Sequence, residues 1–423
     1  MPFRSPFEDV EIPNLSVFDY LFADLEPEAA TKTALVDGTS GEATSYGALV
    51  VQIQRVAGAL AARGIRTGDV VALHSPNVPA FATAFHGILR AGATATTVNA
   101  LYTAEEIEKQ LRDSAAIMLI TVSPLLPQAA AAAKAAGIER VIVMDGAEGH
   151  ESLRDLIMED APAPDVSFDP ATHIAVLPYS SGTTGLPKGV VLTHRNLVAN
   201  VAQSLAQITL NDEDRVMAVL PFFHIYGMTV LLNLALRVRA ALVTMPRFDL
   251  PEFLRIIQDH KISWVFIAPP IAVALAKHPI VDNYDLSSIK VVFSGAAPLD
   301  GDLAKAVASR LHCVVRQGYG MSEMSPVSHA IPVERDDIPL DTVGLTLPNM
   351  ECKIVDPETG AEIEVPSEGV SAPGELWCKG PNIMVGYLHN DAATAEVLDA
   401  EGWLRTGDIA TVTAEGYVRV VDR

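Results

Sequence analysis

Short apolar runs of strand length alternate with segments of helical periodicity from Gly47 to about Ser294. This alternation is typical of βα units, in which helices cover both faces of a parallel sheet. In the first set of units, strands are expected near 69–74, 94–99, 117–122 and 140–144, and helices near 47–63, 79–91, 103–113 and 125–136. Thr103 and Glu106 form a capping box that marks the start of the third helix. The sequence therefore predicts an α/β fold with doubly wound sheets.

A stretch rich in proline and aspartate, residues 159–170, separates this set from a second one. The second set is expected to have strands near 174–178, 215–220, 241–245, 263–267 and 289–294, and helices near 194–208, 225–236, 250–260 and 300–311. After Ile331 the chain changes to short β-rich pieces divided by proline, glycine and acidic residues. We expect two βα lobes packed together, residues 1–170 and 171–331, and a small β-barrel-like subdomain over 332–423.

The charge balance limits the classes of partner. The chain has 30 Lys and Arg against 52 Asp and Glu, a formal net charge of −22. Such a field repels nucleic acid backbones and anionic bilayers, so partners of these two kinds are disfavoured. No apolar stretch approaches the roughly 18 residues of a membrane span. A phosphorylated ligand must then be held by local groups such as backbone N–H donors, a lysine or a metal ion.

The cysteines indicate the redox compartment. Cys313, Cys352 and Cys378 are an odd number of residues without CxxC spacing, which argues against a disulfide framework and against a zinc site. The N-terminus carries no apolar run of the kind found in secretory signals. These features predict a reducing, cytoplasmic setting.

A segment dense in glycine, hydroxyl groups and one lysine follows the strand that ends at Pro178. Glycines bring backbone N–H groups toward an anion, hydroxyls add donors, and a lysine supplies a point charge for terminal phosphates. The segment is not a Walker A loop, because Lys188 lies between Pro187 and Gly189. An ordinary turn is the alternative to a phosphate loop made of Ser180, Ser181, Gly182, Thr183, Thr184, Gly185 and Lys188.

A second glycine-containing segment, residues 317–323, follows the strand-like Val314 and Val315. A dinucleotide fingerprint would need a third glycine where Glu323 stands, and a carboxylate there would repel a pyrophosphate unless a divalent metal lay between them. Mg²⁺ is the natural inference. Taken alone, Glu323 would more often be a solvated loop acid than a metal ligand.

These two segments together resemble the AMP-binding core of the acyl-adenylate-forming superfamily, which includes acyl-CoA synthetases, firefly luciferase and peptide-synthetase adenylation domains. The resemblance continues in order through residues 221–227, 294–299, 374–376, 403–408 and 421–423. Within the superfamily the chain looks most like the 4-coumarate:CoA ligases. The motifs cover about 179–423, and the first 170 residues fit the family by length and βα order.

The resemblance implies ATP-dependent conversion of a carboxylic acid to acyl-AMP with release of pyrophosphate, followed by capture of the acyl group by the thiol of CoA. Three alternatives stay open: a carrier-protein phosphopantetheine as the thiol, oxygen chemistry in place of thiol capture, and a noncatalytic adenylate-binding module. A P-loop kinase and an NAD-dependent dehydrogenase are rivals that fail at Pro187 and Glu323.

The resemblance also assigns roles to single residues. Residues 180–188 would cover the β- and γ-phosphates of ATP, Glu323 would ligate Mg²⁺, and Ser322, where the family more often has threonine, would reach the α-phosphate. Asp408 would accept both ribose hydroxyls and His224 would steady the attacking carboxylate. The implied adenosine site consists of Ala296, Ala297, Pro298, Gln317, Gly318, Tyr319, Gly320, Asp408 and Arg423.

The implied acid pocket is mostly apolar, which favours an aryl or bulky hydrophobic acid. Tyr226 could hydrogen-bond a distal phenol. Phe293 is bulkier than the residue that the resemblance leads us to expect, so cinnamate-like, benzoate-like and larger alicyclic acids all stay open. The pocket residues are His224, Ile225, Tyr226, Val230, Phe293, Ala296, Gly318, Pro326 and Val327.

Members of the family continue past the final Asp-Arg motif into a hinge and a small C-terminal domain with a lysine that contacts the reacting carboxylate, whereas this chain ends at Arg423. Loss of one preorganised donor typically slows catalysis by about 10²- to 10³-fold. We therefore expect this chain to bind ATP, acid and acyl-AMP but to turn over poorly.

Overall fold

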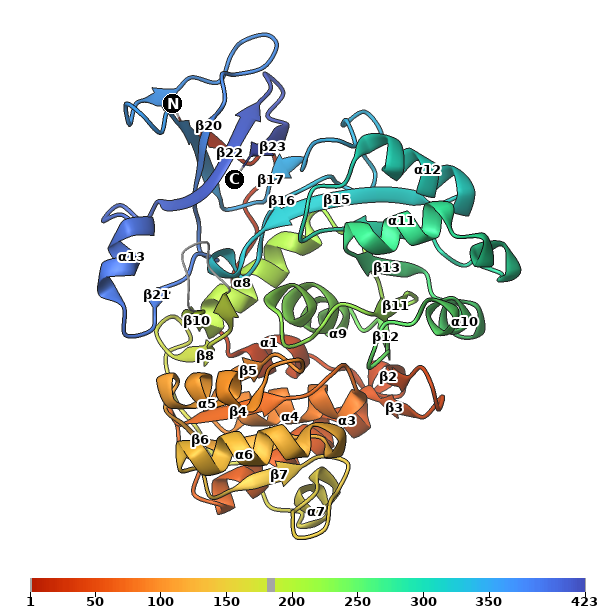
Figure 1. Cartoon of the computed structure of the whole chain (residues 1–423), viewed down its shortest axis with the longest axis vertical. Helices are drawn as coiled ribbons and strands as arrows, with labels where there is room; N and C mark the ends of the chain where they lie inside the picture. Colours follow the sequence, from red (N-terminus) through yellow and green to blue (C-terminus); the bar gives the residue numbers. More distant parts are fainter. Residues whose placement is uncertain (1, 181–186, 423) are drawn as a thin grey trace.

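The computed structural model describes residues 2–180 and 187–422. Its described part contains three β-sheets with helices packed between and around them (Figure 1). The first βα lobe lies at the bottom of the view, the second lies above it and to the right, and a small antiparallel sheet lies at the top. The predicted α/β fold with two doubly wound sheets is confirmed.

The sheet of the first lobe has the strand order β21-β10-β8-β5-β4-β6-β7, with β9 paired to β10. Its strands β8, β5, β4, β6 and β7 are parallel. Successive residues point to opposite faces, so Val71 packs with α3 and α4 while Ala72 packs with α5 and α6. The elements are α3 (Tyr46–Ala62), β4 (Val70–His74), α4 (Pro79–Arg90), β5 (Thr94–Val98), α5 (Ala104–Asp113), β6 (Ala116–Thr121), α6 (Leu126–Ala136), β7 (Val141–Val143), α7 (Leu153–Met158), β8 (Ile174–Val176), β9 (Tyr179–Ser180), β10 (Lys188–Thr193) and β21 (Gly386–Tyr387).

The sheet of the second lobe has the order β17-β16-β15-β14-β13-β11-β12-β2-β3 and is parallel from β15 to β2. Helices α10, α11 and α12 cover one face, and α8 and α9 cover the other, in the core that both lobes share. The elements are β2 (Thr33–Asp37), β3 (Ala43–Ser45), α8 (His194–Leu205), β11 (Arg215–Ala218), α9 (Leu234–Arg237), β12 (Ala241–Thr244), α10 (Leu250–His260), β13 (Trp264–Ile267), α11 (Pro269–Lys277), β14 (Val291–Ser294), α12 (Gly301–Leu311), β15 (Val314–Gly320), β16 (Val327–Ala330) and β17 (Leu345–Thr346).

The third sheet is antiparallel, with the order β1-β18-β20-β22-β23 and β19 paired to β18. Its first strand comes from the N-terminus of the chain and the others come from residues after 350. The elements are β1 (Phe3–Arg4), β18 (Glu351–Val355), β19 (Glu362–Ile363), β20 (Gly374–Lys379), β22 (Leu404–Val412) and β23 (Val418–Asp422). Short helices α1 (Val17–Phe22), α2 (Pro27–Ala30) and α13 (Asp391–Val397) lie outside the three sheets.

Three details differ from the sequence-based expectation. The two large sheets do not divide at residue 170, because β2 and β3 join the second sheet while β8 and β10 join the first. Lys188, expected in the phosphate loop, begins β10, which pairs with β8 and β9. The helix expected at 225–236 contains a π-helical segment, Gly227–Asn233. The first two differences depend on strand partners distant in sequence, which local patterns do not specify.

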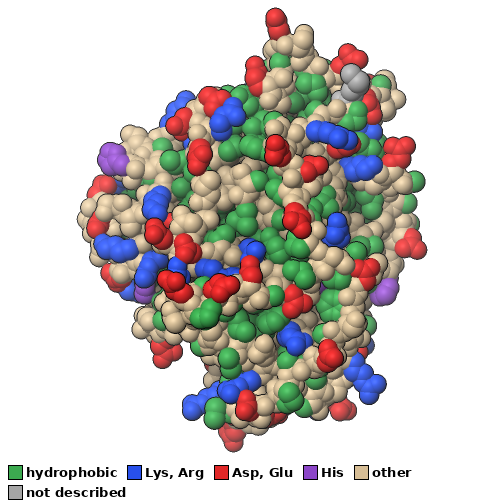
Figure 2. Space-filling view, turned by 180° about the vertical axis from the view of Figure 1, so that it is seen from behind, with side chains coloured by type: hydrophobic (Ala, Val, Ile, Leu, Met, Phe, Trp, Pro, Cys, Tyr) green, Lys and Arg blue, Asp and Glu red, His purple; other side chains and the backbone are tan. Residues whose placement is uncertain are grey.

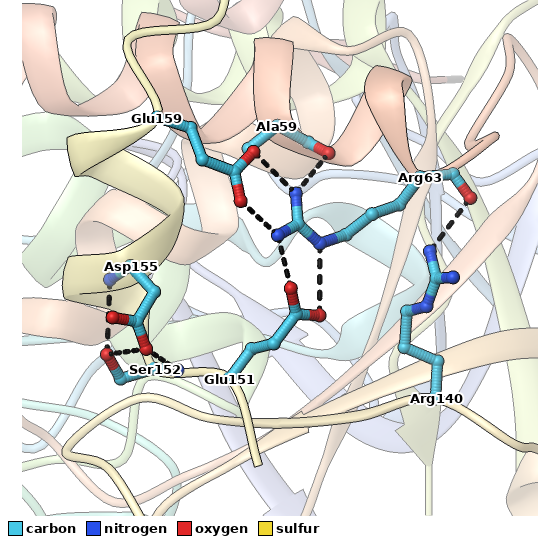
Figure 3. A network of polar contacts seen from close by, with 7 residues as sticks. All are labelled: Ala59, Arg63, Arg140, Glu151, Ser152, Asp155 and Glu159. Carbon is cyan, nitrogen blue, oxygen red and sulfur yellow. Dashed lines mark hydrogen bonds and ion pairs between the residues drawn. The ribbon is translucent and has the colours of Figure 1, made fainter.

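Local signals at helix ends are confirmed. Thr103 and Glu106 make both hydrogen bonds of the capping box, and Gly137 ends α6 with a φ of +78°. At the end of α3, the Arg63 guanidinium donates to the carboxylates of Glu151 and Glu159, and Arg140 donates to the Arg63 carbonyl (Figure 3). This network ties α3 to the segment around α7.

The surface carries charges of both signs. On the face shown in Figure 2, acidic and basic side chains are interspersed and no large basic patch is visible. Over residues 2–180 and 187–422, no helix combines the length and apolar character that crossing a bilayer demands.

Candidate active site

Three cavities meet at the ends of β14 and β15. The two strands are parallel neighbours, with Ser294 opposite Gln317, so the turns that follow them lie side by side. In parallel sheets ligands bind at this carboxyl edge. Ala296, Gly320 and Met321 line all three cavities, which we call the acid arm, the adenosine arm and the phosphate arm after the groups expected in them. One branched cleft therefore brings together segments that the sequence places over 200 residues apart.

The acid arm encloses about 460 Å³ of empty space, measured out to its mouth. Its lining is predominantly apolar, as expected for a small-molecule pocket. The structure brings together here His224 and all eight further residues expected in the acid pocket. Sequence reasoning missed Ile208, Gly295 and Met321, which also line it. Ile208 follows α8 and carries no motif, so no local signal could have identified it.

His224 opens onto both the acid arm and the phosphate arm. Its side chain is exposed to the cleft, while the surrounding protein lowers the pKa of the imidazole through desolvation. The Tyr226 N–H points at its Nδ1 at 3.3 Å, a contact that requires an unprotonated Nδ1. Both observations favour a neutral ring with its proton on Nε2.

Two glycines that line the acid arm, Gly295 and Gly318, lie too close to neighbouring atoms to carry a side chain. A Cβ at Gly295 would lie 2.8 to 3.0 Å from three atoms of the Tyr226 side chain, and a Cβ at Gly318 would lie 2.8 Å from the His329 carbonyl oxygen. Ala296 adopts a φ of +70°, a left-handed conformation that is strained for alanine and is often found at functional sites. The turn after β14 is thus held close against the acid arm.

The adenosine arm, about 1110 Å³, is lined by every described residue expected there, from Ala296 to Pro298, from Gln317 to Gly320, and Asp408. Gln317 fixes the turn by exchanging 3.1 Å hydrogen bonds with the Leu299 N–H and carbonyl. Asp408 lies within β22 and is 5% exposed. The Tyr319 hydroxyl donates to Asp408 Oδ2 at 2.5 Å, and burial together with this carboxylate raises the pKa of Tyr319 well above its usual range.

Besides Leu299 and Met321, five residues of the adenosine arm had no role assigned to them from the sequence, although Val421 and Asp422 belong to the motif at 421–423. They enter the arm through the turn before β17 and through β23, the last described strand. These are Asp341, Val343, Val420, Val421 and Asp422. The neighbouring Arg423, expected beside the ribose, lies outside the described residues.

The phosphate arm, about 1180 Å³, is more polar. It contains Ser180, Ser322 and Glu323, together with Thr97 and Asn99 from the first lobe. Glu323 is 5% exposed, and its Oε1 accepts hydrogen bonds from Tyr387 at 2.8 Å and Ser180 at 3.4 Å. Of the expected phosphate loop, Ser181, Gly182, Thr183, Thr184 and Gly185 lie outside the described residues.

Tyr387 links the expected lysine to the expected metal ligand. The Lys188 ammonium lies 5.0 Å from the centre of the Tyr387 ring, whose hydroxyl donates to Glu323. Burial and the Glu323 carboxylate raise the pKa of Tyr387 above its usual value, so the hydroxyl stays a donor. Sequence reasoning missed Tyr387, which reaches the site because β21 pairs with β10; a tyrosine in an otherwise ordinary segment gave no signal.

The described carboxylate suits a magnesium ion. Both hydrogen bonds that described residues donate to the Glu323 carboxylate end on Oε1, so none of these residues occupies Oε2. Within the described chain no group of three or more His, Cys, Asp or Glu side chains is arranged to hold a metal. Mg²⁺ is commonly held by one or two carboxylates together with the phosphates of a nucleotide, and the single buried Glu323 fits that pattern.

Comparison with known proteins identifies the family. Residues 25–388 match the model of the AMP-binding enzyme family. The chain is 40% identical to 4-coumarate--CoA ligase 5 of Oryza sativa subsp. japonica and to 4-coumarate--CoA ligase 1 of Solanum tuberosum, in both cases over 100% of this chain and 78% of the relative.

Among solved structures it resembles a long-chain-fatty-acid-CoA ligase from Archaeoglobus fulgidus, with a TM-score of 0.90 and 27% identity over 100% of this chain and 86% of that one. It also resembles an anthranilate CoA ligase in complex with anthranoyl-AMP, with a TM-score of 0.89 and 27% identity over 98% of this chain and 79% of that one. The chain therefore belongs to the AMP-binding enzyme family of acyl-adenylate-forming CoA ligases.

Proposed function

We propose that this chain activates an aryl or bulky hydrophobic carboxylic acid as its acyl-AMP, with CoA as the thiol that then takes the acyl group. The observation that carries the proposal is the junction of three arms at Ala296, Gly320 and Met321. A carboxylate in the acid arm, an adenosine in the adenosine arm and a triphosphate in the phosphate arm would meet at this point. Family membership and relatives named 4-coumarate--CoA ligases support the same reaction.

In the first step, a carboxylate oxygen attacks the α-phosphorus of ATP while the bond to the bridging oxygen of the β-phosphate breaks. The protein's task in such a displacement is mainly positioning and charge stabilisation. We expect His224 to donate Nε2–H to the attacking carboxylate and the Ser322 hydroxyl to donate to the α-phosphate, since both residues line the phosphate arm. Lys188 and the segment before it would neutralise the departing pyrophosphate.

Glu323 would hold Mg²⁺, which supplies charge neutralisation of the phosphates when bound. Tyr387 and Ser180 keep the Glu323 carboxylate in place through its Oε1. Asp408 would accept the ribose hydroxyls, and Tyr319 holds that carboxylate with its own hydroxyl. The thiol of CoA would then attack the acyl carbon, and AMP would leave.

The acid arm supports an aromatic or alicyclic acyl group. Its walls are apolar, and the Tyr226 hydroxyl already has the Phe293 carbonyl oxygen as an acceptor at 3.5 Å. A phenol on the substrate is therefore not needed to satisfy Tyr226, which favours cinnamate-like and benzoate-like acids without a requirement for a para hydroxyl. The slow turnover expected of this chain stays a prediction.

Thermal stabilisation by acyl-sulfamoyl adenosines tests the proposal, because these stable mimics of acyl-AMP require no turnover. A ligand at 100 times its dissociation constant stabilises the folded state by about 2.7 kcal/mol. We expect cinnamoyl or benzoyl analogues to stabilise more than acetyl or long-chain ones. Equal effects across the panel would contradict the acid class, and no effect from any analogue or from AMP would contradict the adenylate site itself.

A further inference from the structure

Two of the three cysteines lie in direct contact in the small antiparallel sheet, whose strand β22 carries Asp408. Strands β18 and β20 are antiparallel, and their register places Cys352 opposite Cys378. Their Sγ atoms are 3.6 Å apart, and both side chains are fully buried. A disulfide bond measures about 2.05 Å, so bond formation would bring the two sulfurs about 1.5 Å closer. The third cysteine, Cys313, lies elsewhere, after α12.

A histidine stands beside this pair. His329 Nε2 lies 3.7 Å from Cys352 Sγ and 3.2 Å from the Thr346 hydroxyl, while its Nδ1 is 2.9 Å from the Ser328 hydroxyl. Burial alone raises the pKa of a thiol, but the contact with Cys378 and the nearby His329 offset this effect and lower the pKa of Cys352, whereas that of Cys378 is raised. Because Cys352 is the cysteine in contact with His329, we expect its sulfur to be the nucleophile, and Cys378 lies in contact with it to resolve the product.

Packing links the pair to the groups expected to hold the nucleotide. His329 is paired with Tyr319 across β15 and β16, and their ring centres are 6.1 Å apart. Tyr319 in turn donates to Asp408 on β22, the strand that pairs with β20 and places Leu404 opposite Cys378. Through these contacts, a shift of β18 and β20 toward each other would be passed on to His329, Tyr319 and Asp408.

We propose that Cys352 and Cys378 are a redox-active pair whose oxidation to a disulfide weakens nucleotide binding in the adenosine arm. The effect on binding rests on the proposed function; the formation of the disulfide does not. A hydroperoxide is the oxidant. The Cys352 sulfur attacks a peroxide oxygen, the O–O bond breaks, and a sulfenic acid forms. The Cys378 sulfur then attacks the Cys352 sulfur and the S–O bond breaks, so that two thiols and one hydrogen peroxide give one disulfide and two waters.

The burial of both sulfurs makes this reaction depend on local opening of the small sheet, so oxidation is slow and bound AMP slows it further. Typical coupling between two sites changes affinity by about 5- to 150-fold, and the same factor acts in both directions. We expect oxidation to weaken AMP binding within this range, and a dithiol reductant to restore it.

The test uses the whole chain, hydrogen peroxide, dithiothreitol and AMP. Peptide mapping by mass spectrometry is expected to show one cross-link, between Cys352 and Cys378, with the loss of about 2 Da that accompanies removal of two hydrogens. Titration calorimetry measures AMP affinity in the reduced, oxidised and re-reduced states. The matched control Cys313→Ser keeps the whole response, whereas Cys352→Ser and Cys378→Ser each lose it.

Each outcome of these experiments tests one part of the proposal. A cross-link through Cys313, or no cross-link in the folded wild-type chain, overturns the redox pair without reference to any variant. A cross-link between Cys352 and Cys378 with unchanged AMP affinity overturns its coupling to the adenosine arm. Failure of the reduced chain to bind AMP overturns the proposed function and the coupling together, while the peptide map still decides whether the disulfide forms.

Discussion

Replacement of Gly295 by alanine is expected to close the acid arm and leave the adenosine arm intact. The new Cβ would lie 2.8, 2.9 and 3.0 Å from Cε1, Cζ and the hydroxyl oxygen of Tyr226. These separations are below ordinary van der Waals contact, and Gly295 itself has no left-handed φ, so the effect is steric. Tyr226 is 8% exposed, its hydroxyl donates to the Phe293 carbonyl oxygen, and its side chain lines the acid arm, so we expect the ring to be displaced into that arm.

The expected loss of affinity for an acyl group follows from the free-energy cost of overpacking the acid arm. Forcing one extra carbon into a packed site costs about 1 to 3 kcal/mol, and a displaced ring in the pocket would weaken binding of a bulky acyl group by roughly 5- to 150-fold. AMP affinity should change less than about twofold, a free-energy change well below 1 kcal/mol, because Tyr226 does not line the adenosine arm.

Calorimetric titration of wild type and Gly295→Ala with AMP and with cinnamoyl-sulfamoyl adenosine measures both effects. Gly301→Ala is the matched control, since a Cβ there would meet its nearest atom, the Asp341 Cβ, at an ordinary 3.5 Å. Unchanged affinity of Gly295→Ala for the acyl analogue would refute the steric argument. Equal loss for AMP and the acyl analogue would place the effect outside the acid arm.

Three further predictions concern other parts of the chain. Asp408→Ala should weaken AMP binding by about 1 to 3 kcal/mol, because ribose hydroxyls would lose their acceptor; unchanged affinity by calorimetry would remove Asp408 from the site. Tyr387→Phe should raise the Mg²⁺ concentration needed for half-maximal stabilisation by ATP in a thermal shift titration while sparing AMP, because Glu323 loses a 2.8 Å donor; equal effects on both nucleotides would indicate a general structural role. Burial lowers the pKa of His194 from 6.5 to about 3. Between these two pH values the histidine is protonated in the unfolded chain but not in the folded chain. The free energy of unfolding should therefore fall as the pH drops through this window. Within this window His194 alone should lower the free energy of unfolding by up to about 1.4 kcal/mol for each pH unit of acidification. Urea unfolding of His194→Gln should therefore show a shallower pH dependence than that of the wild type.

Much of the candidate site could be predicted from the sequence because its chemistry lies in contiguous segments. Residues 317–323 and 294–298 keep their hydroxyl, carboxylate and small side chains in fixed order, and these segments carry the resemblance to the acyl-adenylate-forming superfamily that implies adenylate chemistry. The capping box at Thr103 and the alternation of strands and helices are likewise local, and both agree with the structure. Local chemistry and periodicity therefore determined the fold class and the family.

Tertiary structure decided what depends on pairing between distant segments. The sequence did not place Tyr387 against Glu323, Tyr319 against Asp408, or Ile208 in the acid arm, because each contact joins residues from different sheets or lobes. The contact between Cys352 and Cys378 depends in the same way on the register of β18 and β20, which spacing along the chain does not specify. Strand register and the packing of the lobes are set by the burial of whole sheet and helix faces, which involves residues from distant parts of the chain. The residues of the site could therefore be predicted from the sequence, whereas their distances and contacts could be seen only in the folded structure.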